Sequence, residues 1–291
     1  GFISVLLNFF IPLNLINNSI LFLIITLIGI KLSFFKQNKK EILKKALIIS
    51  SISFLLIIYS NVNRPDAWLY HLPYSSIVNE YKIILGAANI HERFAHISIF
   101  QYVSSFFYNY LFLFNGIVIP ISLVASFFFL FTYIEFKKNF FINSTTIYSY
   151  INFLILCLSL YAFNRYSEYG NDAQSHFFYF FFTIILFKYL LINKGTDSIK
   201  ELFFISIFIF FIKPTFVVVL LIPLFLFINL KQRKKVLNSL SFLFFSLFLI
   251  IWILKNILTT GCLLYPLNFT CNNNILWKVD NLNQHTLINE A

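Results

Sequence analysis

Charged residues and several residue types that soluble proteins use freely are scarce in this chain of 291 residues. Only 11% of the residues are charged, whereas an average soluble domain is about 25% charged. Methionine is absent, and the chain has three cysteines, seven glycines and seven prolines. This composition excludes a soluble enzyme, a disordered chain and a disulfide-stabilised scaffold.

Hydrophobic residues are in excess. They make up 59% of the chain, which includes 41 phenylalanines and 16 tyrosines. Because one soluble core cannot bury so many, the composition predicts an all-α, polytopic bundle of transmembrane helices. The net charge of +11 does not indicate nucleic-acid binding, since the basic residues form short clusters between apolar runs.

The cysteines and the missing motifs limit the chemistry. Cys157 lies in an apolar run, whereas Cys262 and Cys271 either pair in an oxidising compartment or remain free thiols. No cysteine–histidine pattern has zinc spacing, and no Walker-type, serine-hydrolase or zincin motif is present. We therefore expect no metal site and no cofactor. The first residue is Gly1, so we expect a fragment that forms a single membrane domain over residues 1–291.

Apolar stretches recur along the chain, and about 20 apolar residues suffice to cross a bilayer. They cover residues 1–16, 18–34, 46–60, 115–136, 147–163, 174–192, 201–230 and 236–257. Four basic clusters lie between some of these stretches: Lys36, Lys39, Lys40, Lys44 and Lys45; Lys137 and Lys138; Lys194 and Lys200; and Lys231, Arg233, Lys234 and Lys235. Short basic loops stay cytoplasmic, so the four clusters are predicted to share that side.

The opposite, outer face then contains the loop 61–114 with juxtamembrane helices, the loop 164–173, and residues 258–291 as the start of an outer C-terminal segment. All five histidines fall on this face. Such a face is a plausible place for chemistry, although acids and histidines also simply avoid the positive side of a membrane.

Two segments need a choice between alternatives. Residues 94–114 are long enough to span, but a crossing there would move Lys137 and Lys138 outside, so we predict an amphipathic helix at the outer interface. Residues 201–230 are too long for one crossing at an ordinary tilt. We expect two short helices that meet at Lys213 and Pro214, because proline interrupts the helical hydrogen-bond ladder.

Candidate functional residues concentrate in the first outer loop. Ionisable groups beside a membrane are costly unless they serve a purpose, and this loop combines histidines, acids and aromatic residues. An ordinary solvated loop is the alternative. The candidates here are Asp66, Tyr70, His71, Glu80, His91 and Arg93.

Further candidates come from later in the chain. Glu168 and Asp172 in the second outer loop are suited to binding substrate hydroxyls. Lys213 lies within an apolar stretch, where a lysine either snorkels to the surface or pairs with an anion such as a lipid phosphate. Lys255, near the outer end of the last helix, is a weaker candidate of the same kind.

This pattern resembles the GT-C superfamily of integral-membrane glycosyltransferases. The resemblance rests on Asp66 in RPDAWLYHLP, on the juxtamembrane stretch 76–114 with GAANIHERF, and on Lys213 in the turn FIKPT. It covers roughly residues 46–291. The chain departs from the family plan because about two apolar segments precede the Asp66 loop and a large outer domain is missing.

The resemblance implies a GT-C-like helical fold and an inverting glycosyltransferase in the inner (plasma) membrane of a bacterium, active outside the cytoplasm. Asp66 would act as general base on an acceptor hydroxyl, and Lys213, helped by Arg93 or Lys255, would stabilise the departing polyprenyl phosphate. The implied partners are a polyprenyl-phosphate-linked sugar, a glycan, lipid or protein acceptor, and the bilayer. A transporter or flippase for lipid-linked substrates, or a polysaccharide polymerase or ligase, remains the alternative.

Overall fold

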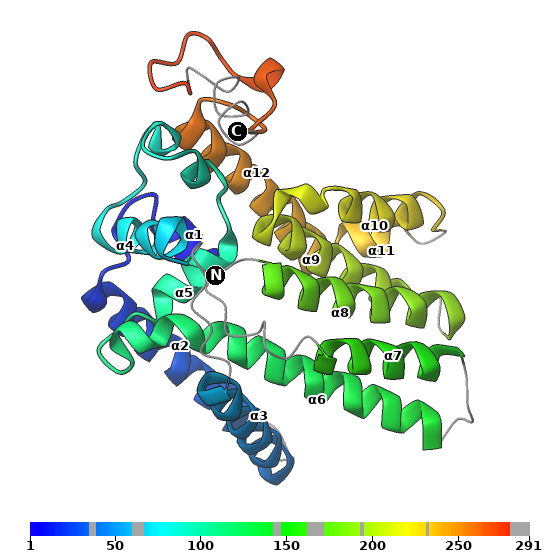
Figure 1. The fold of residues 1–291 in the computed structure, drawn as a ribbon. Coiled ribbons are helices and arrows are strands. Elements are labelled where there is room, and N and C mark those ends of the chain that lie inside the picture. The colour runs from blue at the N-terminus through cyan, green and yellow to red at the C-terminus, as the bar shows by residue number, and fades with distance from the viewer. Residues whose placement is uncertain are drawn as a thin grey trace.

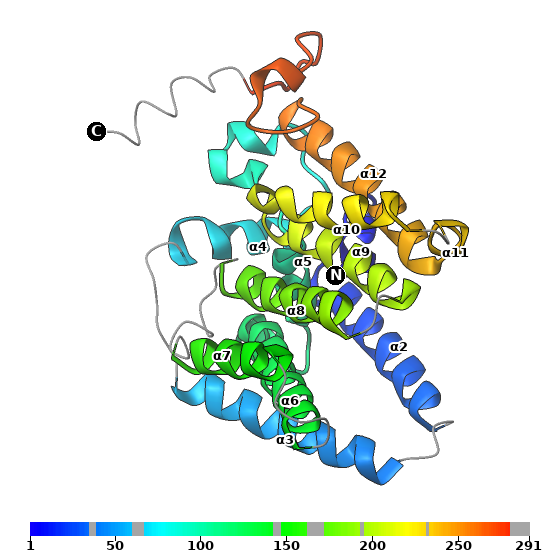
Figure 2. The same ribbon diagram turned by 90° about the vertical axis from the view of Figure 1, so that its right-hand side faces the viewer.

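The computed structural model describes residues 1–34, 39–59, 67–141, 147–161, 172–192, 195–230 and 233–279. In these ranges the chain is helical and has no named strand; one isolated bridge joins Cys262 and Cys271. The prediction of an all-α protein is confirmed for this part of the chain. Figures 1 and 2 show the helices as an elongated bundle with a cap of short segments at one end.

The helices vary widely in length. The longer ones are α2 (Leu15–Phe34), α3 (Lys39–Tyr59), α6 (Ile119–Phe141), α7 (Ile147–Tyr161), α8 (Asp172–Leu191), α9 (Thr196–Ile212), α10 (Val218–Ile228) and α12 (Leu240–Thr260). The short ones are α1 (Phe2–Leu7), η1 (Ala67–His71), α4 (Leu72–Glu80), η2 (Ala87–Asn89), η3 (Glu92–Ala95), α5 (Ile99–Phe107), η4 (Leu113–Val118), η6 (Pro214–Phe216), α11 (Arg233–Leu237) and η7 (Asn268–Thr270).

Within the described ranges, four helical stretches are long and apolar enough to cross a membrane: Leu15–Leu32, Leu113–Lys138, Asp172–Leu191 and Leu240–Thr260. Two shorter apolar stretches, Ile147–Tyr161 and Pro214–Ile228, accompany them. Helix α3 is also of membrane length, but basic residues occupy its first two turns. The structure thus agrees with a membrane protein by helix length and composition.

Two expectations about the apolar stretches are wrong. Residues 1–16 do not form a membrane-length helix, because α1 ends at Leu7 and an irregular segment with Pro12 leads into α2. Residues 94–114 do not form one amphipathic helix at an interface. Within this stretch, only α5 is an α-helix. Most of its residues are buried, because other helices pack around it.

The predicted break near Pro214 is confirmed. Helix α9 ends at Ile212, and Lys213 adopts an extended backbone before the short turn η6 and helix α10. Proline cannot donate the hydrogen bond that a continuous helix would need at this point. As a result, α9 and α10 run back along each other (Figure 1). Lys213 lies in the turn between them.

Helix α9 lies at the centre of the bundle, packed against α8, α10 and α12. Its core positions, including Leu202, Phe203, Ile207 and Ile209, are fully buried. A helix that is apolar all round is best satisfied in the interior. Helix α2 is the opposite case: it is mostly exposed and is attached near its start, where Asn18 Nδ2 donates to the carbonyls of Ser105 and Tyr108 at 2.9 Å.

The bundle has two chemically different ends. Basic residues lie where α6, α8 and α10 end and where α9 begins, and these termini gather on one side of the molecule (Figure 1). We call this side the basic end. The opposite side, where α8 begins and α9 ends, meets η1, α4 and η3 and is called the site end.

Candidate functional site

An ion pair joins two of the predicted site residues at the site end. Lys213 Nζ lies 2.5 Å from Asp172 Oδ1, which brings the α9–α10 turn to the first residue of α8. Both side chains are well exposed, at 40% for Lys213 and 65% for Asp172. Exposed pairs of this kind contribute only about 0–1 kcal/mol to stability. The pair therefore holds the lysine ammonium in position without being an important element of the fold.

Two histidines act electrostatically on the Asp172 carboxylate of this ion pair. His71, at the end of η1, and His176, one turn after Asp172 on α8, both interact with the Asp172 carboxylate. Lys213 in turn acts on His96, which follows η3. The charge cluster around Lys213 is therefore built from four segments: the α9–α10 turn, the start of α8, the end of η1 and the residues at η3.

The environment of His96 favours the neutral form of its imidazole. Loss of solvation lowers the pKa of His96, the charges of Arg93 and Lys213 lower it further, and Glu92 opposes them. The residue as a whole remains exposed, so the desolvation comes from neighbouring atoms crowding the ring. One of these neighbours is Tyr265, whose ring centroid lies 5.4 Å from that of His96.

A row of contacting side chains extends outward from buried His71 at the site end. The rings of Tyr70 and His71 are 4.2 Å apart, and His91 stacks on Tyr70 at 6.4 Å. The Arg93 guanidinium lies 5.3 Å from the Tyr70 ring centroid, a cation–π distance. His91 Nδ1 also accepts a hydrogen bond from the Arg93 backbone N–H at 3.1 Å, which caps η3.

Gly86 positions the loop that carries His91 and Arg93. Its φ of 66° lies in the left-handed region, and its N–H donates to the Leu258 carbonyl at 2.9 Å. A Cβ at this position would come within 2.9 Å of the Trp277 Cβ. A glycine is needed both for the backbone conformation and for this close approach. The loop is thereby tied to the end of α12.

The structure brings together six of the ten predicted site residues. They are Tyr70, His71, His91, Arg93, Asp172 and Lys213. His91 and Arg93 do not contact the ion pair directly; they are connected to it through Tyr70 and His71. Asp66 and Glu168 lie outside the described residues. Asp66 directly precedes η1 in the sequence.

Glu80 is not brought into the cluster. It is exposed at the last residue of α4, where it accepts a hydrogen bond from Ser76 Oγ at 3.1 Å. This local contact, within one turn of a single helix, gives Glu80 the character of a solvated surface residue.

Lys255 is also apart from the cluster, in a buried position. Only 1% of it is exposed, and its Nζ donates to Asn8 Oδ1 at 3.0 Å. Lys255 Nζ lies 4.2 Å from the Tyr102 ring centroid and 5.0 Å from that of Phe9. These contacts anchor the segment after α1 against α12 and α5 rather than leaving the lysine open to a lipid phosphate.

The tyrosines beside Lys255 form a neutral pair. The hydroxyls of Tyr74 and Tyr102 are 2.8 Å apart, and burial raises the pKa of Tyr74 to about 12, although the hydrogen bond from Tyr102 acts the other way. Tyr102 likewise has a raised pKa because of burial. Both phenols remain protonated at neutral pH, so Lys255 Nζ lies against neutral ring faces and not beside a phenolate.

Sequence reasoning missed three residues of the cluster: His96, His176 and Gln101. His176 follows Asp172 by four residues, so a shared helix face was visible in the sequence. His96 and Gln101 gave no comparable signal, because their contacts with Tyr265 and His71 are long-range. No group of three or more potential metal ligands occurs in the described ranges.

Comparison with known proteins assigns a family. Residues 1–290 match the family model described as "Domain of unknown function (DUF8201)". The chain belongs to this family. No curated protein and no solved structure matches the chain. The description of the family names no activity, so its function has to be argued from the site.

Proposed function

We propose that the protein is a membrane glycosyltransferase that moves a sugar from a polyprenyl-phosphate donor to an acceptor hydroxyl at the non-cytoplasmic face. The observation that carries this proposal is the Lys213–Asp172 ion pair at the end of two apolar helices, beside His71, His96 and His176. The cluster combines a cation for the lipid phosphate with hydrogen-bonding groups for a sugar.

Lys213 is suited to the phosphate of the donor. The apolar helix α10 leads directly away from it, so a lipid whose chain lies along the bundle would bring its headgroup to the ammonium. Negative charge on the leaving phosphate grows as the glycosidic bond breaks, and a cation already in place stabilises that charge. An exposed carboxylate partner can be exchanged for a phosphate at little cost.

Asp66 is assigned the role of general base. It would take the proton of the acceptor hydroxyl as the hydroxyl oxygen bonds to the anomeric carbon and the bond to the phosphate oxygen breaks, with inversion. This assignment rests on the sequence, in which Asp66 is five residues before His71 and so close in the chain to a member of the cluster. Tyr70 and Arg93 provide a stacked surface suited to a sugar ring.

The Cys262–Cys271 disulfide supports an outer location for the site end. These cysteines, whose state the sequence left open, are bonded in the structure. Disulfides persist in oxidising compartments and are rare in the cytosol. The segment that contains them includes Tyr265, which contacts His96 of the cluster. The basic residues at the other end of the bundle agree with this orientation.

The test compares two lysines associated with α9. Lys213→Ala should strongly weaken both binding of a polyprenyl-phosphate sugar and its transfer, because the ammonium of Lys213 contacts the phosphate. Lys200→Ala is the matched control, since Lys200 also pairs with an aspartate, Asp197, at 2.8 Å but lies at the basic end. The measurements are binding of the lipid-linked sugar to purified protein and release of polyprenyl phosphate.

Equal effects of the two substitutions would contradict a phosphate site at Lys213. Binding that depends on Lys213, without any sugar transfer to acceptors of the three classes, would instead favour the transporter or flippase.

A further inference from the structure

A buried glutamine contacts one histidine of the cluster. Gln101 lies in the first turn of α5 and is 5% exposed, and His71 at the end of η1 is 7% exposed. The Gln101 amide nitrogen Nε2 is 3.3 Å from His71 Nδ1. The two residues are 30 positions apart in the sequence, so only the packing of α5 against α4 and η1 brings them together.

The contact with His71 is the hydrogen bond that accounts for the burial of this amide. In the part of the chain that the structure describes, Gln101 Oε1 has no hydrogen-bond partner. Burial of an amide without partners is unfavourable by roughly 1–3 kcal/mol. A buried glutamine whose oxygen is unpaired therefore contributes little to stability. Its amide N–H instead makes a hydrogen bond with His71.

The chemistry of this contact determines where the imidazole proton lies. An amide N–H is a donor, so His71 Nδ1 has to act as the acceptor and carries no proton. A neutral imidazole has one N–H, which is then on Nε2.

We infer that Gln101 is a positioning residue that holds His71 in the Nε2–H tautomer, so that His71 serves the site as a neutral hydrogen-bond donor. In this tautomer His71 donates to carboxylate, phosphate or sugar oxygens, whereas the general base has to be another group. The hydrogen bond from His71 to a substrate rests on the proposed function. The tautomer of His71 does not.

The test reads the tautomer directly. Protein with ¹⁵N-labelled histidine is purified in lipid nanodiscs, and the signals of His71 are assigned by comparison with His71→Gln. In the wild-type protein at neutral pH, His71 should show a protonated Nε2 and an unprotonated Nδ1. Gln101→Glu should move the proton to Nδ1, because a carboxylate accepts where the amide donated. Gln101→Leu should leave a mixture of the two tautomers.

A matched control uses another buried amide. Asn152 on α7 is fully buried, and its Nδ2 donates to the Tyr148 carbonyl within the same helix. Asn152→Leu should leave the His71 signals unchanged.

A wild-type protein with its His71 proton on Nδ1 would overturn the inference, even if neither Gln101 variant folds. So would an unchanged tautomer in both Gln101 variants. Loss of the proposed function would appear separately, as a protein with the expected tautomer that neither binds nor transfers a lipid-linked sugar.

Discussion

The two ends of the helical bundle use charged and polar side chains in different ways. At the site end, contacts join residues far apart in the sequence: Lys213 with Asp172, Gln101 with His71, and His96 with Tyr265. Away from the site end, two ion pairs lie within one helix: Glu41 with Lys45 near the start of α3, and Asp197 with Lys200 at the basic end.

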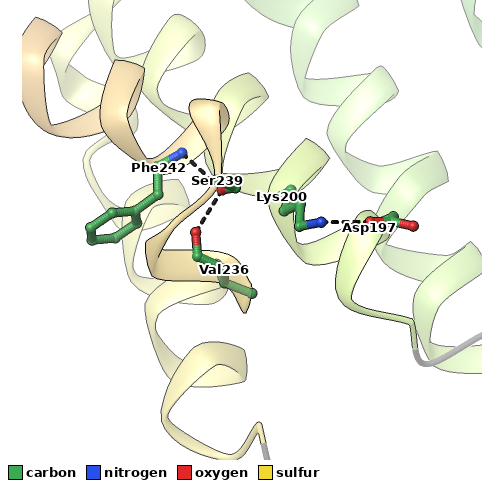
Figure 3. Close-up of polar contacts among 5 residues, drawn as sticks. All are labelled: Asp197, Lys200, Val236, Ser239 and Phe242. Atoms are coloured by element: carbon green, nitrogen blue, oxygen red, sulfur yellow. Dashed lines mark hydrogen bonds and ion pairs between the residues drawn. The ribbon is translucent and has the colours of Figure 1, made fainter. Parts of the chain in front are cut away.

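Figure 3 shows the local character of the basic end. Lys200 Nζ reaches Asp197 one turn away on α9, and Ser239 caps α12 by accepting from the Phe242 N–H at 3.3 Å while donating to the Val236 carbonyl at 2.6 Å. Such contacts define where helices begin and add little to tertiary specificity. One contact at this end does cross between helices, since Glu135 on α6 pairs with Lys188 on α8 at 3.6 Å.

This difference shows where the fold creates something that local sequence cannot. A pair within one helix forms wherever the helix forms, whereas a pair between distant segments needs the whole bundle to be in place. The long-range polar contacts at the site end are therefore typical of a functional site. The local pairs elsewhere are typical of solvated helix surfaces. The following four predictions test this contrast.

The largest expected effect concerns which side of the membrane each end faces. With Cys157 replaced by serine, Lys82→Cys at the site end should react with a membrane-impermeant maleimide in intact cells. Lys44→Cys, in the basic first turns of α3, should react only after lysis, since basic clusters stay cytoplasmic. Both lysines are exposed. Mass spectrometry of the labelled protein gives the answer, and the reverse pattern would contradict the assigned orientation.

The next effect is on catalysis. Asp66→Asn should lower sugar transfer by roughly 10²–10⁴-fold, the usual contribution of a general base, while the protein remains folded in detergent. The measurement is the initial rate of transfer from a polyprenyl-phosphate sugar. Glu80→Gln serves as the control, because Glu80 lies apart from the cluster and its substitution should leave the rate nearly unchanged. Full activity of the Asp66 variant would remove Asp66 from the mechanism.

A smaller effect is expected when Lys213 loses its partner. Asp172→Asn should increase affinity for a polyprenyl phosphate by roughly two- to fivefold, because an exposed ion pair worth about 0.2–1 kcal/mol no longer competes with the ligand. The dissociation constant in nanodiscs is the quantity to measure. Weaker binding in this variant would mean that Asp172 itself contacts the ligand or orients the lysine for it.

The smallest effect is expected near the start of α3. Glu41→Gln removes the pair with Lys45, which lies 2.7 Å away and is exposed on both sides. Solvent screening makes such a pair weak, so the thermal unfolding midpoint should not change measurably. A clear decrease would show that local pairs away from the site end contribute to the fold, and it would weaken the contrast with the site end.

Much of the architecture could be predicted from the sequence. The break at Pro214 follows from a missing backbone donor, and helices such as α2, α6, α8 and α12 follow from uninterrupted apolar length. The short elements could not be predicted in the same way. Residues 94–114 are apolar enough for one helix, but tertiary packing divides them into η3, α5 and η4 and buries α5.

The site was predicted in part for the same reason. Tyr70, His71, Asp172 and Lys213 were identifiable because ionisable and aromatic groups beside apolar helices are conspicuous in the sequence. Lys255 met the same criterion, yet the structure encloses it among Asn8, Phe9 and Tyr102. Whether a lysine at a helix end reaches the surface or the interior depends on which segment packs over it.

The sequence by itself determined that this protein is helical and suited to a membrane, and where its charges fall along the chain, because apolar length and charge placement are local properties. Only the tertiary structure decided that Lys213 meets Asp172, that Gln101 meets His71, and that Lys255 is buried. Those contacts depend on how helices distant in the chain pack against one another, and no short stretch of sequence contains that information.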